Sequence, residues 1–130
     1  MASLGKWLIL AVAAPAVFLL LRSHATAEGG LSPAGAAAWM EETKHLQLVD
    51  VRSEREYAAG HLAGAKLLPV PEIEDRLSEI DERRPVLLYC RTGHRSDSAL
   101  RILREHGYAE AKHLAGGILA WRAAGLPTTR

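Results

Sequence analysis

The order of strand-like and helix-like segments in this chain predicts an α/β fold, a small central parallel sheet flanked by helices on both faces. Short β-branched and aliphatic runs bounded by turn residues alternate with segments of helical spacing. Strands separated by helices in this way form parallel β-α units joined by right-handed crossovers, whose helices cover both faces of the sheet. The composition fits a single globular domain, because 24% of the residues are charged and 48% are apolar.

Helix-capping residues place the first two helices. Ser32 and Pro33 provide an N-cap followed by proline at the first helical position, so a helix is expected from residue 33 to about residue 43. Ser53 and Glu56 form a capping box that opens a short helix, and Gly60 ends it. Buried strands are expected at residues 46–51 and 65–68.

The second half of the chain repeats this alternation. A helix is expected to begin at residues 69–71 and to carry Ile73, Leu77 and Ile80 on one face. Residues 81–84 are expected to form a solvated turn. The remaining expected elements are a central strand that begins at Val86, a helix that ends at Gly107, a strand at residues 112–115, a helical turn with Trp121 in the core, and an end of the structured chain at residues 125–127.

The first 27 residues are expected to be a separate unit from the domain at 28–130. No charge interrupts residues 7–21, Lys6 and Arg22 flank them, and Ala25-Thr-Ala27 gives a small-residue cleavage pattern before a hinge at residues 28–30. Such a segment is either a signal peptide that is removed or an anchor that keeps the protein at the membrane. A buried core helix is the disfavoured alternative. Either main interpretation predicts a location in the cell envelope, periplasmic or anchored to the inner membrane.

Charge and cysteine content exclude several classes of function. The 16 Lys and Arg residues nearly balance the 15 Asp and Glu residues, so the whole chain offers no electrostatic case for nucleic-acid binding. One cysteine forms neither an internal disulfide nor a zinc site that needs several thiolates. No metal or organic cofactor is expected, and the oligomeric state is left open.

Cys90, the only cysteine, ends the central apolar run and directly precedes a helix-like segment. Backbone N–H groups at a strand-to-helix turn and the positive end of the helix dipole both favour an anion such as a thiolate. Arg91 and Arg95 add full positive charges within the same few residues. The sequence therefore predicts a cysteine whose pKa is lowered and which acts as a nucleophile.

Three blocks of the sequence resemble the signatures of the rhodanese-like family, in the order that the family has them. The blocks are Asp50-Val-Arg52 with Glu56-Tyr57-x-x-Gly60-His61-x-x-Gly64-Ala65 and Pro69; Cys90-x-x-Gly93-x-Arg95-Ser96; and Gly116-Gly117-x-x-x-Trp121-x-x-x-Gly125-x-Pro127. The resemblance covers nearly all of residues 31–127. It implies a single-domain α/β fold and transfer of sulfane sulfur through a persulfide on Cys90.

The residues of the loop fit that chemistry. A Cys90 thiolate attacks the outer sulfur of a donor such as thiosulfate, and a thiol, cyanide or protein acceptor then takes the sulfur. Backbone N–H groups are expected to hold the persulfide anion, Gly93 to permit the tight curvature, and Arg95, with Arg91, to hold the sulfonate of the donor. The expected substrate-binding residues are Arg91, Thr92, Gly93, His94, Arg95 and Ser96.

Four residues are expected to have supporting roles. Asp50 and Arg52 are expected to form an ion pair or hydrogen bonds that support the loop. His61 is expected to order the turn after Gly60 rather than to act as a base, and Ser96 to cap the following helix.

Two alternatives to an active sulfurtransferase remain open. A phosphatase or arsenate reductase of the same fold resembles this loop but has its arginine six places after the cysteine, whereas Arg95 lies five places after Cys90. A shorter loop favours a sulfur atom over a tetrahedral oxyanion. A persulfide carrier or interaction module without turnover shares the same loop, and only a kinetic measurement separates it from an enzyme.

Overall fold

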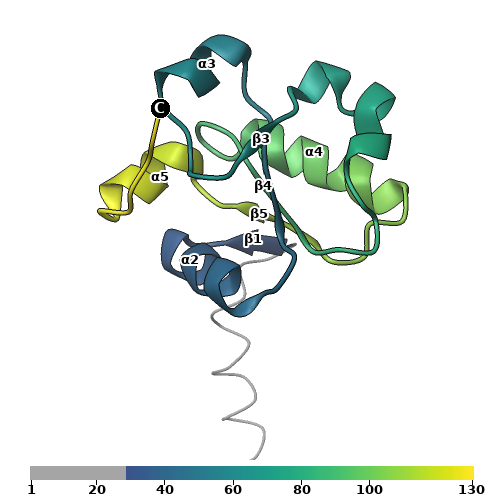
Figure 1. Cartoon of the computed structure of the whole chain (residues 1–130), viewed down its shortest axis with the longest axis horizontal. Coiled ribbons are helices and arrows are strands. Elements are labelled where there is room, and N and C mark those ends of the chain that lie inside the picture. The colour runs from purple at the N-terminus through teal and green to yellow at the C-terminus, as the bar shows by residue number, and fades with distance from the viewer. Residues whose placement is uncertain (1–28) are drawn as a thin grey trace, which may run out of the picture.

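The computed structural model describes residues 29–130, in which a five-stranded sheet lies between two layers of helices. The strand order is β1-β5-β4-β2-β3, and every neighbouring pair is parallel (Figure 1). The strands are β1 (Gly30–Leu31), β2 (Gln47–Asp50), β3 (Lys66–Leu67), β4 (Val86–Tyr89) and β5 (Ala111–Leu114). The predicted fold class is confirmed.

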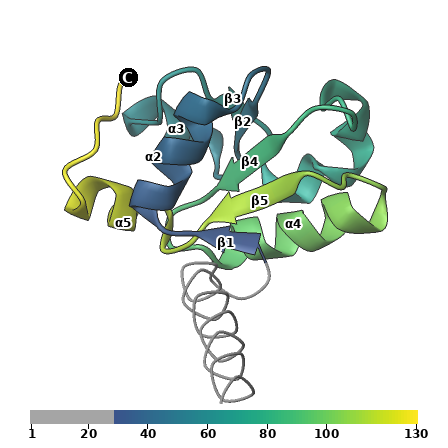
Figure 2. The ribbon, with the colours of Figure 1, turned by 90° about the horizontal axis from the view of Figure 1, so that it is seen from below.

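The helices divide between the two faces of the sheet. They are α2 (Pro33–Glu42), α3 (Glu54–Ala59), α4 (His94–Glu105) and α5 (Gly117–Ala123), with 3-10 helices η2 (Val70–Glu72) and η3 (Glu74–Glu79). Helix α4 lies on the opposite side of the sheet from α2 (Figure 2). All strands run toward the same edge, where β4 ends at Tyr89 immediately before Cys90.

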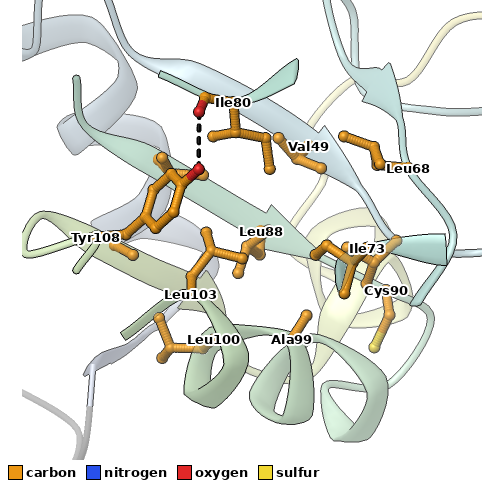
Figure 3. Packing of buried hydrophobic residues seen from close by; sticks show 13 residues of the cluster. Val49, Leu68, Ile73, Ile80, Leu88, Cys90, Ala99, Leu100, Leu103 and Tyr108 are labelled. Atoms are coloured by element: carbon orange, nitrogen blue, oxygen red, sulfur yellow. Dashed lines mark hydrogen bonds between the residues drawn. The ribbon is translucent and has the colours of Figure 1, made fainter. Parts of the chain in front are cut away.

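Alternating side chains of the strands build one hydrophobic cluster on each face. Leu88 and Cys90 pack with Leu100 and Leu103 of α4 on one side (Figure 3). On the other side, Leu87 of the same strand packs with the cluster that includes Trp121 of α5, which is 5% exposed. This alternation is what a pleated strand covered on both faces requires.

The predicted helix starts at Ser32 and Ser53 are confirmed, because their local hydrogen bonds form. The Ser32 Oγ accepts from the Gly35 N–H at 3.1 Å. The Ser53 Oγ accepts from the Glu56 N–H at 3.2 Å, and the Glu56 carboxylate accepts in return from the Ser53 N–H at 3.4 Å. Gly60 closes α3, as predicted.

The helix predicted from residues 69–71 is wrong in type. The structure has two 3-10 helices there, and Arg76 has non-helical backbone angles between its turns. Pro71 supplies no backbone N–H donor, and the bonds that form join residues three apart, such as Ile73 N–H to Val70 O. Ile73 and Ile80 are nevertheless buried, as the spacing predicted.

Both ends of the domain are more ordered than predicted. Gly30, predicted as part of a hinge, lies in β1, where Gly30 and Leu31 pair with His113 and Leu114 of β5. Beyond the predicted end of the structured chain, Thr129 forms an antiparallel bridge with His61. Local patterns did not indicate either pairing because each partner lies far along the chain.

Within residues 29–130, none of the helices has the length and apolar character needed to cross a bilayer. The signal peptide or anchor predicted at residues 1–27 lies outside the described residues.

Candidate active site

Cys90 lies at the turn between β4 and α4, with its sulfur directed toward the start of α4 (Figure 3). The turn is shorter than predicted, because the helix begins at His94 rather than after Ser96. Gly93 makes this possible: its φ of 108° lies in the left-handed region, and the helix starts at the next residue. The Cys90 residue is 1% exposed, so its thiol lies at the base of the loop.

The Cys90 sulfur accepts a hydrogen bond from the Gly93 N–H at 3.0 Å and lies 3.5 Å from the Ser96 Oγ. Burial is the largest influence on this thiol and raises its pKa. Hydrogen bonding by the Ser96 side chain and by the backbone amides of Ser96, Gly93 and Thr92 outweighs burial, so the pKa of Cys90 is lowered. The geometry therefore favours a thiolate. Hydrogen bonds are the main influence that lowers the pKa, and the Arg95 charge also interacts with Cys90.

Ser96 does not cap α4, and the prediction that it does is wrong. The N-cap is Gly93, which has no side chain to make a capping bond, and Ser96 lies inside the first turn. Its fully buried hydroxyl points beneath the loop, where it donates to Gly93 O at 3.2 Å and lies 2.9 Å from His113 Nδ1. Ser96 therefore contacts the sulfur and the adjacent strand β5.

His113 was not predicted as a site residue. It pairs in register with Leu88 on β4, so it shares the face of the sheet on which Cys90 lies two residues later. The available signal was a histidine that follows Lys112 in a short strand, at a position that alternation assigns to the buried face. Burial lowers the pKa of His113 most, Asp97 acts to raise it and Arg104 to lower it, and the net pKa is lowered.

The first turn of α5 holds the outer side of the loop. The Ile118 N–H donates to Cys90 O at 2.9 Å, and the Leu119 N–H donates to Arg91 O at 3.2 Å. Gly117 allows this approach, because a Cβ built there would lie 2.3 Å from the Arg91 carbonyl carbon and oxygen. The glycine pair of the third sequence block therefore serves the loop directly.

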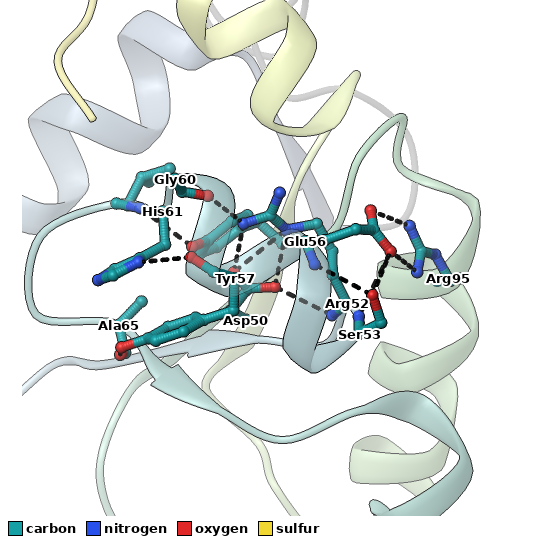
Figure 4. Close-up of polar contacts among 11 residues, drawn as sticks. Asp50, Arg52, Ser53, Glu56, Tyr57, Gly60, His61, Ala65 and Arg95 are labelled. Carbon is teal, nitrogen blue, oxygen red and sulfur yellow. Dashed lines mark hydrogen bonds and ion pairs between the residues drawn. The ribbon is translucent and has the colours of Figure 1, made fainter. Parts of the chain in front are cut away.

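Arg95 makes a two-pronged ion pair with Glu56 of α3. Its Nη1 and Nη2 donate to the two carboxylate oxygens at 2.7 and 2.9 Å (Figure 4). The hydrogen bonds from Arg95 are the largest influence on Glu56 and lower its pKa to about 2. The structure thus places the Arg95 guanidinium on α3, and its predicted role in binding the donor stays a prediction.

Asp50 and Arg52 form a buried ion pair at the end of β2, as predicted. The Arg52 Nη2 donates to Asp50 Oδ2 at 2.7 Å and also to Gly60 O at 2.7 Å, which ties β2 to the end of α3 (Figure 4). The Arg52 guanidinium carbon lies 5.5 Å from the centre of the Tyr89 ring. The pair therefore supports β4 one residue before Cys90.

His61 orders the turn after Gly60, as predicted. Its ring stacks on Tyr57 with centroids 3.7 Å apart, and its Nδ1 lies 2.9 Å from Tyr57 O. Among the other side chains of the predicted site, those of Arg91, Thr92 and His94 are exposed. The structure therefore brings Gly93 and Ser96 to the sulfur and leaves these three residues facing solvent.

Comparison with known proteins agrees with this fold. A family model described as "Rhodanese-like domain" matches residues 32–124. The chain belongs to the rhodanese-like family.

The similarity to particular proteins is moderate. A protein named sulfurtransferase from Allochromatium vinosum is 42% identical over 88 residues, which are 68% of this chain and 82% of that protein. An HTH-type transcriptional regulator of Mycobacterium tuberculosis is 44% identical over 88 residues, which are 66% of this chain but only 38% of the regulator. The crystal structure of a rhodanese-like domain protein from Staphylococcus aureus has a TM-score of 0.67 and 30% identity, and the match covers 72% of this chain and 91% of that one.

Proposed function

We propose that this domain is a sulfurtransferase that carries sulfane sulfur as a persulfide on Cys90. The observation that carries the proposal is the pair of contacts to the sulfur, the Gly93 N–H at 3.0 Å and the Ser96 Oγ at 3.5 Å. Both groups have a proton to offer a thiolate or persulfide anion, and both lie in a turn too short to enclose more than a small group. The name of the Allochromatium vinosum relative supports the same activity.

The reaction has two steps that balance without a cofactor. The Cys90 thiolate attacks the outer sulfur of a donor such as thiosulfate, so a sulfur–sulfur bond forms on Cys90 while the one in the donor breaks and sulfite leaves with its electron pair. An acceptor thiolate or cyanide then attacks the outer sulfur of the persulfide. The Cys90 thiolate leaves and is ready for another donor.

Arg91 is the cation we assign to an anionic donor, ahead of Arg95. Two N–H groups of Arg95 already donate hydrogen bonds to Glu56. Arg91 is exposed beside the loop, and among residues 29–130 it has no ion-pair partner. Its guanidinium is therefore available at the mouth through which a donor reaches the buried thiol, and it suits the planar recognition of a sulfonate.

The loop argues against the phosphatase alternative. The sixth position after Cys90 is Ser96, whose side chain is buried beneath the sulfur, and the arginine at the fifth position is bound to Glu56. The position at which those enzymes have their arginine therefore offers no guanidinium to a phosphate, and Arg95 is already paired. A purified domain that hydrolyses an aryl phosphate faster than it consumes thiosulfate would reverse this ranking.

The first test compares the wild-type domain with Cys90→Ser. We expect thiosulfate and cyanide to give thiocyanate with ping-pong kinetics, and the variant to have lost the activity because it lacks the sulfur nucleophile. Mass spectrometry after exposure to thiosulfate should show one extra sulfur on the wild type and none on the variant. Undiminished activity in Cys90→Ser contradicts the proposal, and a persulfide that forms without turnover identifies a carrier.

The envelope location stays a proposal of its own. It depends on residues 1–27 and on their reading as a signal peptide or a retained anchor. Mass spectrometry of the protein from its native host distinguishes a chain that begins at Met1 from one that begins at Glu28, and fractionation shows whether it is associated with the membrane.

A further inference from the structure

Beneath the loop, Ser96 contacts His113, and His113 in turn faces Asp97. Of these three side chains the proposed reaction uses only Ser96. The Ser96 Oγ lies between Cys90 Sγ at 3.5 Å and His113 Nδ1 at 2.9 Å. The other ring nitrogen of His113, Nε2, lies 3.9 Å from Asp97 Oδ1. Ser96 is fully buried and His113 is 9% exposed, so water has little access between Cys90 and His113, whereas the Asp97 side chain is 34% exposed.

We propose that His113 is a positioning residue that acts on Cys90 through Ser96 and takes up the proton that the thiol loses. The His113 imidazolium then forms when the Cys90 thiolate forms, and both charges are lost when the proton returns to the sulfur. The inference rests on the proposed function only in taking Cys90 as the reacting group.

The Ser96 hydroxyl has fewer protons than acceptors around it, and this shortage couples Cys90 to His113. The hydroxyl has one proton, but Gly93 O, His113 Nδ1 and an ionised Cys90 are all acceptors. While Cys90 is a thiol, its S–H donates to the Ser96 Oγ, and the hydroxyl is free to donate to neutral His113. A thiolate has no proton, so Ser96 must turn its hydroxyl toward the sulfur, and His113 must then donate through Nδ1 instead of accepting.

The proton transfer is balanced among Cys90, Ser96 and His113. The S–H bond of Cys90 breaks and its proton passes to the Ser96 Oγ, while the hydroxyl proton of Ser96 passes to His113 Nδ1. The nearby Asp97 carboxylate favours a proton on Nε2, so His113 becomes an imidazolium with both nitrogens protonated. Ser96 ends as a neutral hydroxyl that donates to the thiolate.

The charges that face His113 make it responsive to an anion at Cys90. From α4, Asp97 favours the imidazolium and Arg104 opposes it; from β1, the residue paired with His113 is the uncharged Gly30. Asp97 is shared, because its Oδ2 also accepts from Arg101 at 2.9 Å. Burial lowers the pKa of His113, so the ring needs a further negative charge to hold a second proton, and the thiolate or persulfide supplies it.

Coupling between two titrating groups is reciprocal, which separates it from a structural role. Loss of the thiolate must lower the pKa of His113, and loss of His113 must raise the pKa of Cys90. Removal of the Ser96 hydroxyl must weaken both effects.

The first experiment follows the His113 ring by NMR as pH is varied, in wild type, Cys90→Ser and Ser96→Ala. We expect the pKa of His113 to be lower in both variants than in wild type, and the ring of exposed His106, which follows α4, serves as the internal reference. An identical His113 titration in wild type and Cys90→Ser overturns the inference.

The second experiment measures the alkylation rate of Cys90 against pH. At neutral pH we expect His113→Asn, which keeps a polar side chain but takes up no proton, to react about tenfold more slowly, the effect of losing one hydrogen bond to a charged group. The double variant Ser96→Ala/His113→Asn should be no slower than the slower single variant. His106→Asn is the matched control and should react like wild type.

An unchanged rate in His113→Asn, or losses that add in the double variant, overturns the inference. Neither experiment requires turnover, so its outcome is distinguishable from that of the proposed function. A coupled Cys90 and His113 in a domain that transfers no sulfur contradicts the function alone, and sulfur transfer without coupling contradicts the inference alone.

Discussion

The pKa of Cys90 depends on two opposed effects of its position at the base of the loop. Burial disfavours the thiolate, whereas the Gly93 N–H and the Ser96 hydroxyl favour it, and the second effect prevails. The same burial would keep water from the persulfide of the proposed reaction. Reactivity at this residue is therefore a property of donors that are fixed in position before a substrate arrives.

Asp50 is expected to matter for stability more than any surface carboxylate. It is fully buried and paired with Arg52, which is 4% exposed, so Asp50→Ala leaves an arginine charge uncompensated in the interior. We expect a loss of about 3–5 kcal/mol in the free energy of unfolding by urea. Asp81→Ala is the control: its partner Arg83 is 85% exposed, and the expected loss is much smaller because solvent screens the pair. Equal losses would contradict the role given to burial.

Glu56 is expected to make the stability of the domain depend on acid pH. Its pKa is about 2 in the folded protein against an ordinary value of 4.5, so its contribution is complete above pH 4.5 and disappears as pH falls toward 2. Glu56→Gln should cost about 1 kcal/mol at neutral pH, because the pair is partly exposed, and nothing at the acid end. Urea unfolding at a series of pH values measures this.

Glu54→Gln is the matched control for Glu56→Gln. Both carboxylates lie in the first turn of α3 and interact with the same helix dipole, but only Glu56 binds Arg95. A pH dependence of equal size in the two variants would assign the effect to the helix rather than to the ion pair.

Among the helices, α4 and α5 have complementary tasks at the loop. Helix α4 begins at His94 and brings its first N–H groups and the Ser96 side chain to the inner side of Cys90. Helix α5 donates its first-turn N–H groups to Cys90 O and Arg91 O on the outer side. The carbonyl groups of the loop are therefore hydrogen-bonded to α5, while its amide groups point toward the Cys90 sulfur.

Gly117→Ala tests the role of α5. A methyl group there meets the Arg91 carbonyl at 2.3 Å, so we expect the loop to shift, sulfur transfer to fall at least tenfold, and stability to fall by about 1–3 kcal/mol beyond that of a control. The control is Gly125→Ala, which has a similar positive φ of 77° but nothing within 4 Å of the added methyl group. Equal activities in the two variants would show that the close approach of α5 is not needed.

In the whole molecule, pairings between distant segments hold the ends of the chain. Residues 30–31 add a strand to β5, and Thr129 joins the turn that contains His61. His61 in turn stacks on Tyr57 of α3, the helix that carries the partner of Arg95. The C-terminus is therefore connected to the wall of the site through α3.

Deletion of residues 128–130 is expected to destabilise the domain without abolishing transfer. It removes two hydrogen bonds of 2.8 Å between the Thr129 and His61 backbones, worth about 1–2 kcal/mol together, while α5 keeps its contacts to the loop. Thermal unfolding and the thiocyanate assay measure the two effects. Deletion of Arg130 alone is the control, and a similar loss of stability in it would contradict the role of Thr129.

The features that could be predicted from sequence depend on neighbours in the chain. Ser53 reaches Glu56 within one turn, Gly93 supplies its own backbone freedom, and Cys90 follows directly on an apolar strand. These local relations hold even if the order or the register of the strands is predicted wrongly. They were sufficient for the fold class and for the position of Cys90 between a strand and a helix.

The features that escaped prediction depend on where distant segments meet. Glu56 and Arg95 are 39 positions apart, and His113 and Ser96 are 17 apart. Whether Ser96 caps its helix or points beneath the loop depends on a helix start that lies three residues earlier than predicted and on the strand that lies opposite. No pattern in a single segment carries that information.

By itself, the sequence determined that this is an α/β domain with a cysteine at a strand-to-helix turn, because periodicity, caps and turn residues are local properties of the chain. Only the tertiary structure assigned the partners of that turn: Glu56 to Arg95, α5 to the loop carbonyls, and His113 to Ser96. The physical reason is that a hydrogen bond is set by position in space, and parallel strands bring residues together according to sheet order and register.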